Sequence, residues 1–259
     1  MTLTLNTATA THVGLVRPGN EDSVLALENT LVVADGMGGA AGGEIASKFV
    51  VDQFASEARA GRSSIFDAAQ MRLLLSMAHR GITDIARESL RAFLAGEPGE
   101  LLRGMGTTAV AASFHLAGDD PAAHVIHCGD SRAYVFADGM LARITRDHTV
   151  YQDYVDRELA ADAGELAELK KIYGHVLTRA LGGDEEGNHE PDMTMIPVRA
   201  GQRFLLCSDG LHDMLTDIDI HAHLAVTTAS PEQIAEALIE SALAAGGHDN
   251  ISVAIADVD

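Results

Sequence analysis

The sequence predicts an α+β fold in which packed antiparallel sheets are covered by helices. Groups of short strand-like segments are separated by long helical stretches, whereas a parallel sheet would alternate single strands with helices. Some strand connections are only two or three residues long, as at Asp138-Gly139, which suits antiparallel neighbours. The chain has 259 residues, 47% of them hydrophobic, enough to bury one large core. We therefore expect a single domain over residues 1–259.

Eight short apolar or alternating segments, bounded by Gly, Asp or Asn, are predicted to be strands. In chain order they are Val13–Val16, Ser23–Leu27, Leu31–Ala34, Thr107–Leu116, Ala123–Cys128, Ala133–Ala137, Phe204–Cys207 and Ile251–Ala256. The connections Gly129-Asp130-Ser131 and Asp138-Gly139 are each expected to join antiparallel neighbours.

Three segments are predicted to be helices. The first two are residues 43–60 and 66–93, and the second has apolar residues at helical spacing along one face. The third, residues 231–244, has Ser230 as N-cap, Pro231 at its first position and Gln233 as capping-box partner. The charged region from Asp147 to Gly187 shows no strand signal before Val176 and is expected to be helix plus a mobile excursion.

Composition argues against several classes of partner. Eighteen Lys and Arg stand against 38 Asp and Glu, a formal charge of −20, which repels nucleic-acid phosphates and anionic membrane surfaces. The two cysteines, Cys128 and Cys207, end apolar runs and suit reduced, buried thiols, so a cytoplasmic location is expected. Neither a signal peptide nor a membrane span is expected.

Four aspartates occur where an apolar strand ends or begins, each beside Gly, Ser or Asn. They are Asp35, Asp130, Asp209 and Asp249. Carboxylates at strand ends can converge at one edge of a sheet assembly, where they would repel one another unless cations neutralise them. Oxygen ligands without a Cys or His cluster favour Mg²⁺ or Mn²⁺ over zinc. Two such ions about 3.5–4 Å apart are the known arrangement for hydrolysing phosphate esters.

The segment Arg17-Pro18-Gly19-Asn20-Glu21-Asp22 adds an arginine beside two further carboxylates. A guanidinium suits bidentate recognition of a phosphate dianion, and Glu21 and Asp22 can order metal-bound water. A polar turn with an exposed salt bridge explains the same residues about as well.

In chain order, these motifs resemble those of the type 2C metal-dependent serine/threonine protein phosphatases in their compact bacterial form. The resemblance covers nearly the whole chain. Its segments are residues 17–22, Asp35-Gly36-Met37-Gly38-Gly39, Gly104-Met105-Gly106-Thr107-Thr108, Gly129-Asp130-Ser131-Arg132-Ala133-Tyr134, Thr145-Arg146-Asp147-His148, residues 177–182, Ser208-Asp209-Gly210-Leu211 and Asp249-Asn250.

The resemblance implies a four-layer αββα sandwich with a binuclear metal centre at one end, holding two Mn²⁺ or Mg²⁺ ions. Asp35 would bridge the ions, and the Gly36 carbonyl, Asp209 and Asp249 would complete their ligands. Asp130, with Asp209, would hold a weaker third ion. Glu21 and Asp22 would hold metal-bound water, and Arg17 would bind phosphate.

The implied reaction is hydrolysis of phosphoserine and phosphothreonine on proteins, by in-line attack of a water that bridges the two ions. Bacterial members typically oppose a eukaryotic-like Ser/Thr kinase, so the expected partners are phosphorylated proteins and the expected state is a monomer. Two features depart from the pattern. Met37 stands where eukaryotic members have a histidine proposed as general acid. The segment Tyr151–Gly174, within the variable flap expected at about residues 150–187, matches no flap sequence of the family.

Other readings of the motifs are weaker. Residues 36–41 fit a dinucleotide-binding fingerprint, but Asp35 would face the pyrophosphate and no second strand follows the first helix. Residues 129–133 nearly match the nucleophile elbow of hydrolases, with Ser131 as nucleophile, but a predicted strand follows them where the elbow requires a helix. His148 and His248 are expected to be structural residues, not ligands. A pseudophosphatase that binds phosphoproteins without hydrolysing them is the main alternative, although the intact Asp35, Asp209 and Asp249 argue against it.

Overall fold

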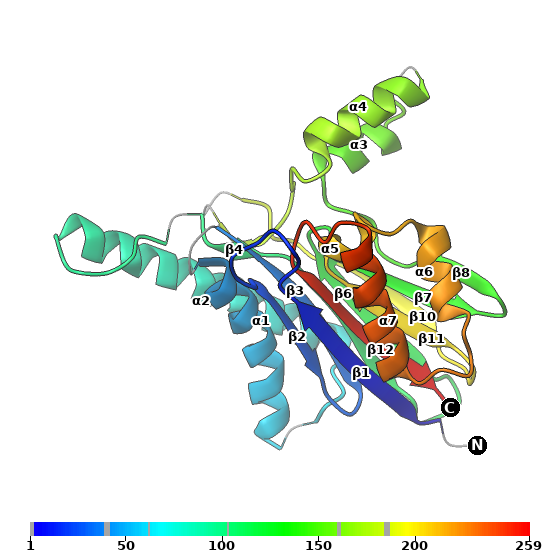
Figure 1. Ribbon diagram of the computed structural model, residues 1–259. Coiled ribbons are helices and arrows are strands. Elements are labelled where there is room, and N and C mark those ends of the chain that lie inside the picture. Colours follow the sequence, from blue (N-terminus) through cyan, green and yellow to red (C-terminus); the bar gives the residue numbers. More distant parts are fainter. Residues whose placement is uncertain (1–2, 39–41, 62, 103, 160–161, 184–186) are drawn as a thin grey trace.

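The computed structural model describes residues 3–38, 42–61, 63–102, 104–159, 162–183 and 187–259. Its centre consists of two antiparallel sheets packed face to face (Figure 1). The first sheet has the strand order β1 (Leu5–His12), β12 (Ile251–Val258), β11 (Arg203–Cys207), β7 (Arg132–Ala137) and β8 (Met140–Arg143). The second has the order β10 (Asp192–Pro197), β6 (Ala122–Cys128), β5 (Ala109–His115), β3 (Thr30–Met37), β4 (Gly106–Thr107) and β9 (Leu181–Gly182), with β2 (Asp22–Ala26) also paired to β3.

Alternating side chains give each sheet two apolar faces. In β3, Leu31 and Val33 belong to the core between the sheets, whereas Val32 and Ala34 belong to the core beneath the helices. Phe114 and Phe204 meet edge to face between the sheets, with ring centroids 5.0 Å apart. Because successive residues of a strand point to opposite faces, strands covered on both sides read as continuous apolar runs.

Helices cover both outer faces, which confirms the αββα sandwich. On the second sheet lie α1 (Gly42–Arg59) and α2 (Ala68–Leu94) (Figure 1). On the first sheet lie α5 (Asp209–His212), α6 (Asp217–Leu224) and α7 (Pro231–Ala244). The predicted capping box of α7 is present, with Ser230 and Gln233 each accepting a backbone N–H of the other. No helix in the described part of the chain is both long and apolar enough to span a membrane.

Two helices stand away from the sandwich (Figure 1). They are α3 (Val150–Asp156) and α4 (Ala163–Tyr173), and neither contains a buried residue. We call residues 150–176, as far as they are described, the flap. Its base is fastened by backbone hydrogen bonds from Val150 to Val176 and from Thr178 to His148. Helices within residues 147–187 are thus confirmed.

Two predictions about strands were wrong. Val13–Val16 is not a strand, and the first strand is Leu5–His12, which pairs along its whole length with β12. Its Thr and Ala residues give only a weak apolar pattern, because Ala8 is the only buried residue of this edge strand. The connection Gly129-Asp130-Ser131 does not join neighbours in one sheet, since β6 and β7 belong to different sheets. Gly129 allows this crossing with a φ of 107°.

Other strand predictions were incomplete. The segment Thr107–Leu116 forms two strands, β4 and β5, and the strands β8, β9 and β10 were not predicted. Every pairing between the described strands is antiparallel, which excludes the parallel sheet of a dinucleotide-binding fold. Residues 39–41, which complete that fingerprint, and Gly39 of the Asp35 motif lie outside the described residues.

Candidate metal centre

The predicted site residues come together at one end of the sandwich. A cleft of about 1390 Å³ is lined by Arg17, Glu21, Asp35, Gly36, Asp130, Asp209 and Asp249, together with flap and loop residues. Asp22 does not line the cleft, but it is opposite Asp35 in the β2–β3 pairing and only 8% exposed. The structure therefore brings together carboxylates from β2, β3, the β6–β7 crossing, the start of α5 and the start of β12.

The backbone of Asp35 is fixed by Thr107 of β4 and by Thr108, the residue between β4 and β5. Its carbonyl accepts hydrogen bonds from Thr107 Oγ1 at 2.8 Å and from Thr108 N at 2.9 Å. The next residue, Gly36, occupies a position where no side chain fits, because an added Cβ would lie 2.1 Å from the Gly43 carbonyl oxygen. Asp35 and Gly36 are thus held against the start of α1.

Asp209 and Asp249 are fixed by close packing between two chain segments. Asp209 is the first residue of α5, and a Cβ on Gly210 would lie 2.0 Å from the Asn250 carbonyl oxygen. The Asn250 side chain accepts from Glu21 N and donates to two carbonyl oxygens of the N-terminal loop. Asn250 therefore positions Glu21 relative to Asp249.

The site is electrostatically strained by its carboxylates. Burial, followed by repulsion from Asp209, Asp22 and Asp130, raises the pKa of Asp35 well above its usual range. Burial and Asp209 likewise raise the pKa of Asp130. Burial raises the pKa of Asp22 to about 7. Burial, the largest single influence, opposes ionisation of Asp209 too, but His175, His212 and Asp35 together outweigh it and hold the pKa of Asp209 below its usual range.

The donors fit a divalent cation. Asp22 Oδ1 and Asp209 Oδ1 are buried without a hydrogen-bond partner, and Asp35, Asp130 and Asp249 add further carboxylates to the cleft. A cation would neutralise the repulsion and satisfy these atoms. Asp249 is differently placed, because its Oδ2 is 2.5 Å from Arg17 Nη2. The structure thus pairs the expected phosphate-binding arginine with an expected metal ligand.

Sequence reasoning missed several residues at the site. Ser208 Oγ donates to Asp22 Oδ2 at 2.7 Å, which leaves the other oxygen of Asp22 unpartnered. His175 of the flap faces Asp209 and Asp213, 3.7 and 3.4 Å away. Asp213 could have been found from its position four residues after Asp209, one helical turn along. His175 had no such signal, because it is 34 residues away in the chain.

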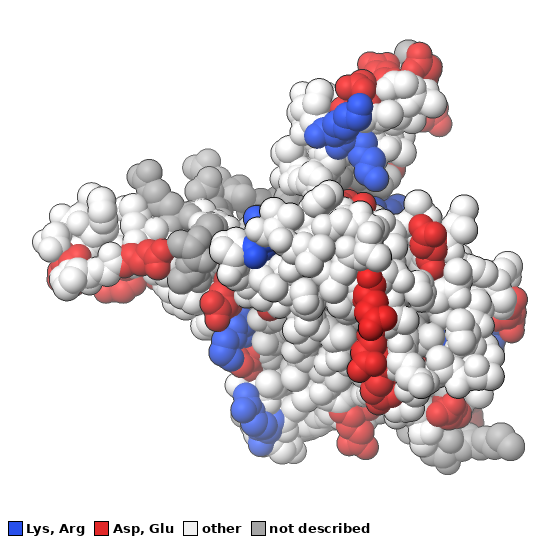
Figure 2. Space-filling model, viewed as in Figure 1, with Lys and Arg blue, Asp and Glu red and all other residues white. Residues whose placement is uncertain are grey.

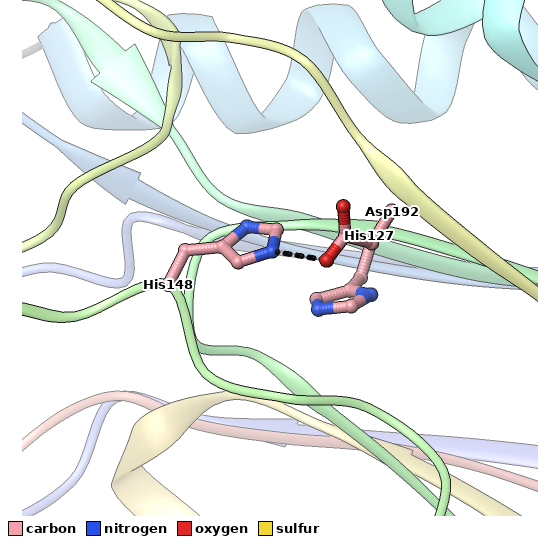
Figure 3. A group of neighbouring side chains, drawn as sticks. All are labelled: His127, His148 and Asp192. Atoms are coloured by element: carbon pink, nitrogen blue, oxygen red, sulfur yellow. Dashed lines mark hydrogen bonds and ion pairs between the residues drawn. The ribbon is translucent and has the colours of Figure 1, made fainter. Parts of the chain in front are cut away.

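The second cluster of candidate metal ligands is His127, His148 and Asp192 (Figure 3). His148 Nδ1 accepts a hydrogen bond from Gly129 N, so its hydrogen is on Nε2, which contacts Asp192 Oδ2 at 3.1 Å. Coordination through Nε2 would therefore require an imidazolate or loss of the bond to Gly129. These contacts make His148 a structural residue that ties the Gly129 crossing to β10.

Charge is unevenly distributed over the surface. Figure 2 shows acidic side chains in a column over α7 and a group of basic side chains on the flap. Lys170 and Lys171 are in the last turn of α4 and line the cleft. In a chain of net charge −20, the flap thus brings two ammonium groups to the acidic cleft.

Comparison with known proteins identifies relatives over the whole chain. The model of the family described as protein phosphatase 2C matches residues 29–251. The serine/threonine protein phosphatase PstP of Mycobacterium tuberculosis is 38% identical over the full chain, which covers 46% of that relative. The serine/threonine phosphatase stp of Listeria monocytogenes is 30% identical, with 96% of this chain and 94% of the relative covered.

Solved structures give the same result. The catalytic domain of PstP in complex with two manganese ions is 37% identical, with a TM-score of 0.76 and 99% of each chain covered. Stp1 from Staphylococcus aureus is 27% identical, with a TM-score of 0.79 and coverage of 98% of this chain and 95% of that one. The chain spans less than half of the length of the PstP relative.

Proposed function

The chain belongs to the protein phosphatase 2C family, and on that premise we propose that it hydrolyses phosphoserine and phosphothreonine on proteins. The observation that carries the proposal is the convergence of Asp35, Asp209 and Asp249 in one cleft with unpartnered carboxylate oxygen. The two sheets share one core, so we also propose that residues 1–259 are a single catalytic domain.

Metal binding is assigned to specific groups. Asp35 would bridge two ions, with the Gly36 carbonyl, Asp209 and Asp249 as further ligands and Asp130 with Asp209 holding a weaker third. Divalent Mn²⁺ or Mg²⁺, when bound, supplies charge neutralisation and an activated water for in-line attack. Glu21 and Asp22 orient water, and Asp22 is itself oriented by Ser208.

Substrate binding is assigned to the cationic groups of the cleft. The Arg17 guanidinium is 52% exposed and close enough to Asp249 to approach a phosphoryl group at the centre. Lys170 and Lys171 reach the same cleft from the flap and would attract the anionic phosphopeptide. We propose that the partners are phosphorylated proteins made by a eukaryotic-like Ser/Thr kinase, dephosphorylated by a monomeric cytoplasmic enzyme.

The leaving alkoxide must receive its proton from a group other than Met37. Its thioether has no ionisable hydrogen, and its methyl group is against Gly106, where an added Cβ would lie 2.9 Å from Met37 Cε. Met37 therefore packs against β4 and does not act as general acid.

Hydrolysis of p-nitrophenyl phosphate and of a phosphothreonine peptide, measured with and without Mn²⁺, tests the proposal. We expect activity that depends on Mn²⁺ and that falls at least about 100-fold in Asp209→Asn, since a ligand oxygen's charge is removed. The matched control is His248→Asn, which changes an exposed histidine of the same cleft and should keep the wild-type rate of hydrolysis. A folded protein that binds the phosphopeptide but shows no Mn²⁺-dependent turnover would instead identify a pseudophosphatase.

A further inference from the structure

The loop that carries Arg17 presents two exposed apolar side chains. Leu15 and Val16 are 66% and 65% exposed, and single exposed apolar residues are common on protein surfaces. Their positions differ, however, because Val16 lines the cleft of the metal centre and Leu15 does not. Val16 also directly precedes Arg17, the proposed phosphate-binding residue. An apolar side chain is therefore open to solvent next to the residue that would bind the phosphoryl group.

The loop cannot withdraw Val16 from the cleft without losing hydrogen bonds. The side-chain nitrogen of Asn250 donates to the carbonyl oxygens of Val13 and Gly19, 2.9 Å from each, and so ties both ends of the loop to one point. Between these ends, Leu15 N donates at 2.7 Å to a carbonyl oxygen of the loop before β12. Because these bonds fix the backbone on both sides of Val16, the exposure of its side chain is set by the fold.

Other apolar side chains line the same cleft. Met214 follows α5, and its sulfur is next to Gly246, where an added Cβ would lie 3.5 Å from Sδ. Ala167 belongs to α4, and Leu177 comes directly after the flap. We call Val16, Ala167, Leu177 and Met214 the apolar lining of the cleft. It is drawn from the N-terminal loop, the flap region and the segment after α5.

The cleft is larger than a phosphate ester requires. Its volume of about 1390 Å³ exceeds the roughly 300–1,000 Å³ of pockets that hold drug-sized molecules. A phosphoryl group would occupy only the part near Arg17 and the carboxylates. An extended peptide advances about 3.3 Å per residue, and consecutive Cα atoms such as those of Val16 and Arg17 are about 3.8 Å apart. Side chains within two positions of a bound phosphoresidue can therefore reach Val16.

We propose that the apolar lining selects phosphorylated segments that have a large apolar residue within two positions of the phosphoserine or phosphothreonine. This inference rests on the proposed function and names its substrate class. A leucine, isoleucine, methionine or phenylalanine there would cover Val16 and remove apolar surface from water on both molecules. Glu21 and Glu44 line the same cleft, so an acidic side chain in that place would meet repulsion. Val16 is thus a specificity-determining residue.

Turnover of matched phosphothreonine peptides tests the proposal. In an otherwise polar peptide, Leu replaces Ser in turn at positions −2, −1, +1 and +2 from the phosphothreonine, and kcat/KM is measured with Mn²⁺. We expect Leu at one or more of these positions to raise kcat/KM about 10-fold, whereas Glu at the same position should not. In Val16→Ser the gain from Leu should fall to about 3-fold or less. Each gain compares two peptides on one variant, so it does not depend on that variant's overall activity.

Leu15→Ser is the matched control, because it removes an equally exposed apolar side chain from the adjacent position outside the cleft. It should keep the wild-type gain from Leu. A gain below about 2-fold at every position tested, or an undiminished gain in Val16→Ser, would overturn the proposal. A wild-type dimer that Val16→Ser converts to a monomer would also overturn it, since the apolar lining would then be a contact between two copies of the chain.

Hydrolysis of p-nitrophenyl phosphate, which has no flanking residues, separates this inference from the proposed function. Mn²⁺-dependent hydrolysis of that ester with equal kcat/KM for all peptides would show that only the specificity was wrong. If no substrate is hydrolysed, Kd values for phosphonate analogues of the same peptides, measured by fluorescence anisotropy, provide the test. The Leu analogue should bind about 10-fold more tightly than the Ser analogue to wild type but not to Val16→Ser, and equal Kd values would overturn the inference.

Discussion

Aspartates near the site differ in role according to the partners that their carboxylate oxygens contact. Asp209 has an oxygen without a hydrogen-bond partner, whereas Asp147, also an aspartate within a predicted motif, is held by Arg132 through bonds of 2.6 and 2.9 Å. The first can take a cation, and the second is already satisfied by a guanidinium. Residue type alone does not separate a ligand from a structural ion pair.

The buried His148 should make stability depend on pH. Its side chain is fully buried, and burial lowers its pKa to about 4. Between pH 6.5 and pH 4 the unfolded chain therefore binds a proton that the folded chain does not, so stability falls as the pH falls through this window. From pH 7 to pH 5 this histidine should cost about 2 kcal/mol of unfolding free energy.

Urea denaturation of wild type and His148→Gln at both pH values measures this contribution. The variant should be less stable at pH 7 but lose less on acidification. His248→Gln, which changes an exposed histidine, should keep the wild-type pH dependence. Equal losses in wild type and His148→Gln would contradict the assignment.

At the scale of elements, the site depends on how closely strand and helix backbones approach. The end of β3 is against the start of α1, and Gly36 and Gly43 make that contact possible. The start of α5 meets the start of β12 in the same way through Gly210. Glycines beside the proposed metal-ligand aspartates therefore serve packing between elements as well as turn formation.

Substitution of Gly36 by alanine should destabilise the protein by about 3 kcal/mol or more, because overpacking here meets backbone atoms that cannot rotate away. The new Cβ would lie 2.1 Å from the Gly43 carbonyl oxygen and 2.5 Å from that of Glu21. Gly19→Ala is the control, since no atom lies within 4 Å of its added Cβ. Urea midpoints in metal-free buffer compare the two, and equal midpoints would show that β3 and α1 separate readily.

At the scale of the whole molecule, the sandwich and the flap are built differently. Three apolar cores hold the sheets and their covering helices, and none includes a residue of α3 or α4. The flap helices stack Tyr154 on Tyr173, with ring centroids 5.7 Å apart, and form exposed ion pairs. The fold of the sandwich should therefore be independent of the flap, whereas substrate binding should not.

Replacement of residues 152–174 by an Asn-Gly turn tests this division. Val150 and Val176 are already joined by a backbone hydrogen bond, so a short turn can close the gap. We expect a melting temperature within a few degrees of wild type and retained turnover of p-nitrophenyl phosphate. The KM for a phosphopeptide should rise about 10-fold, because Lys170 and Lys171 are lost.

A full-length Lys170→Gln/Lys171→Gln variant separates charge from shape and should reproduce most of the KM change. Loss of cooperative unfolding in the shortened chain would show that the flap belongs to the folding unit.

Much of the fold and part of the site were determined by the sequence. Strands covered on both faces, such as β3, β5 and β12, appear in the sequence as continuous apolar runs. Long helices with one apolar face appear as apolar residues that recur at helical spacing. Asp35, Asp130, Asp209 and Asp249 stood out because each occurs at the end or start of such a run. These signals are local, since burial of one segment leaves its mark on consecutive residues.

The tertiary structure alone decided what meets across distant segments. The weakly apolar β1 is a strand because β12 offers it a partner, and β6 and β7 lie in different sheets although three residues join them. His175 meets Asp209 and Asp213 because the flap folds back onto α5. Such contacts depend on the packing of the complete sandwich, which a local pattern does not encode. The carboxylates were thus visible in the sequence, and their surroundings were set by the fold.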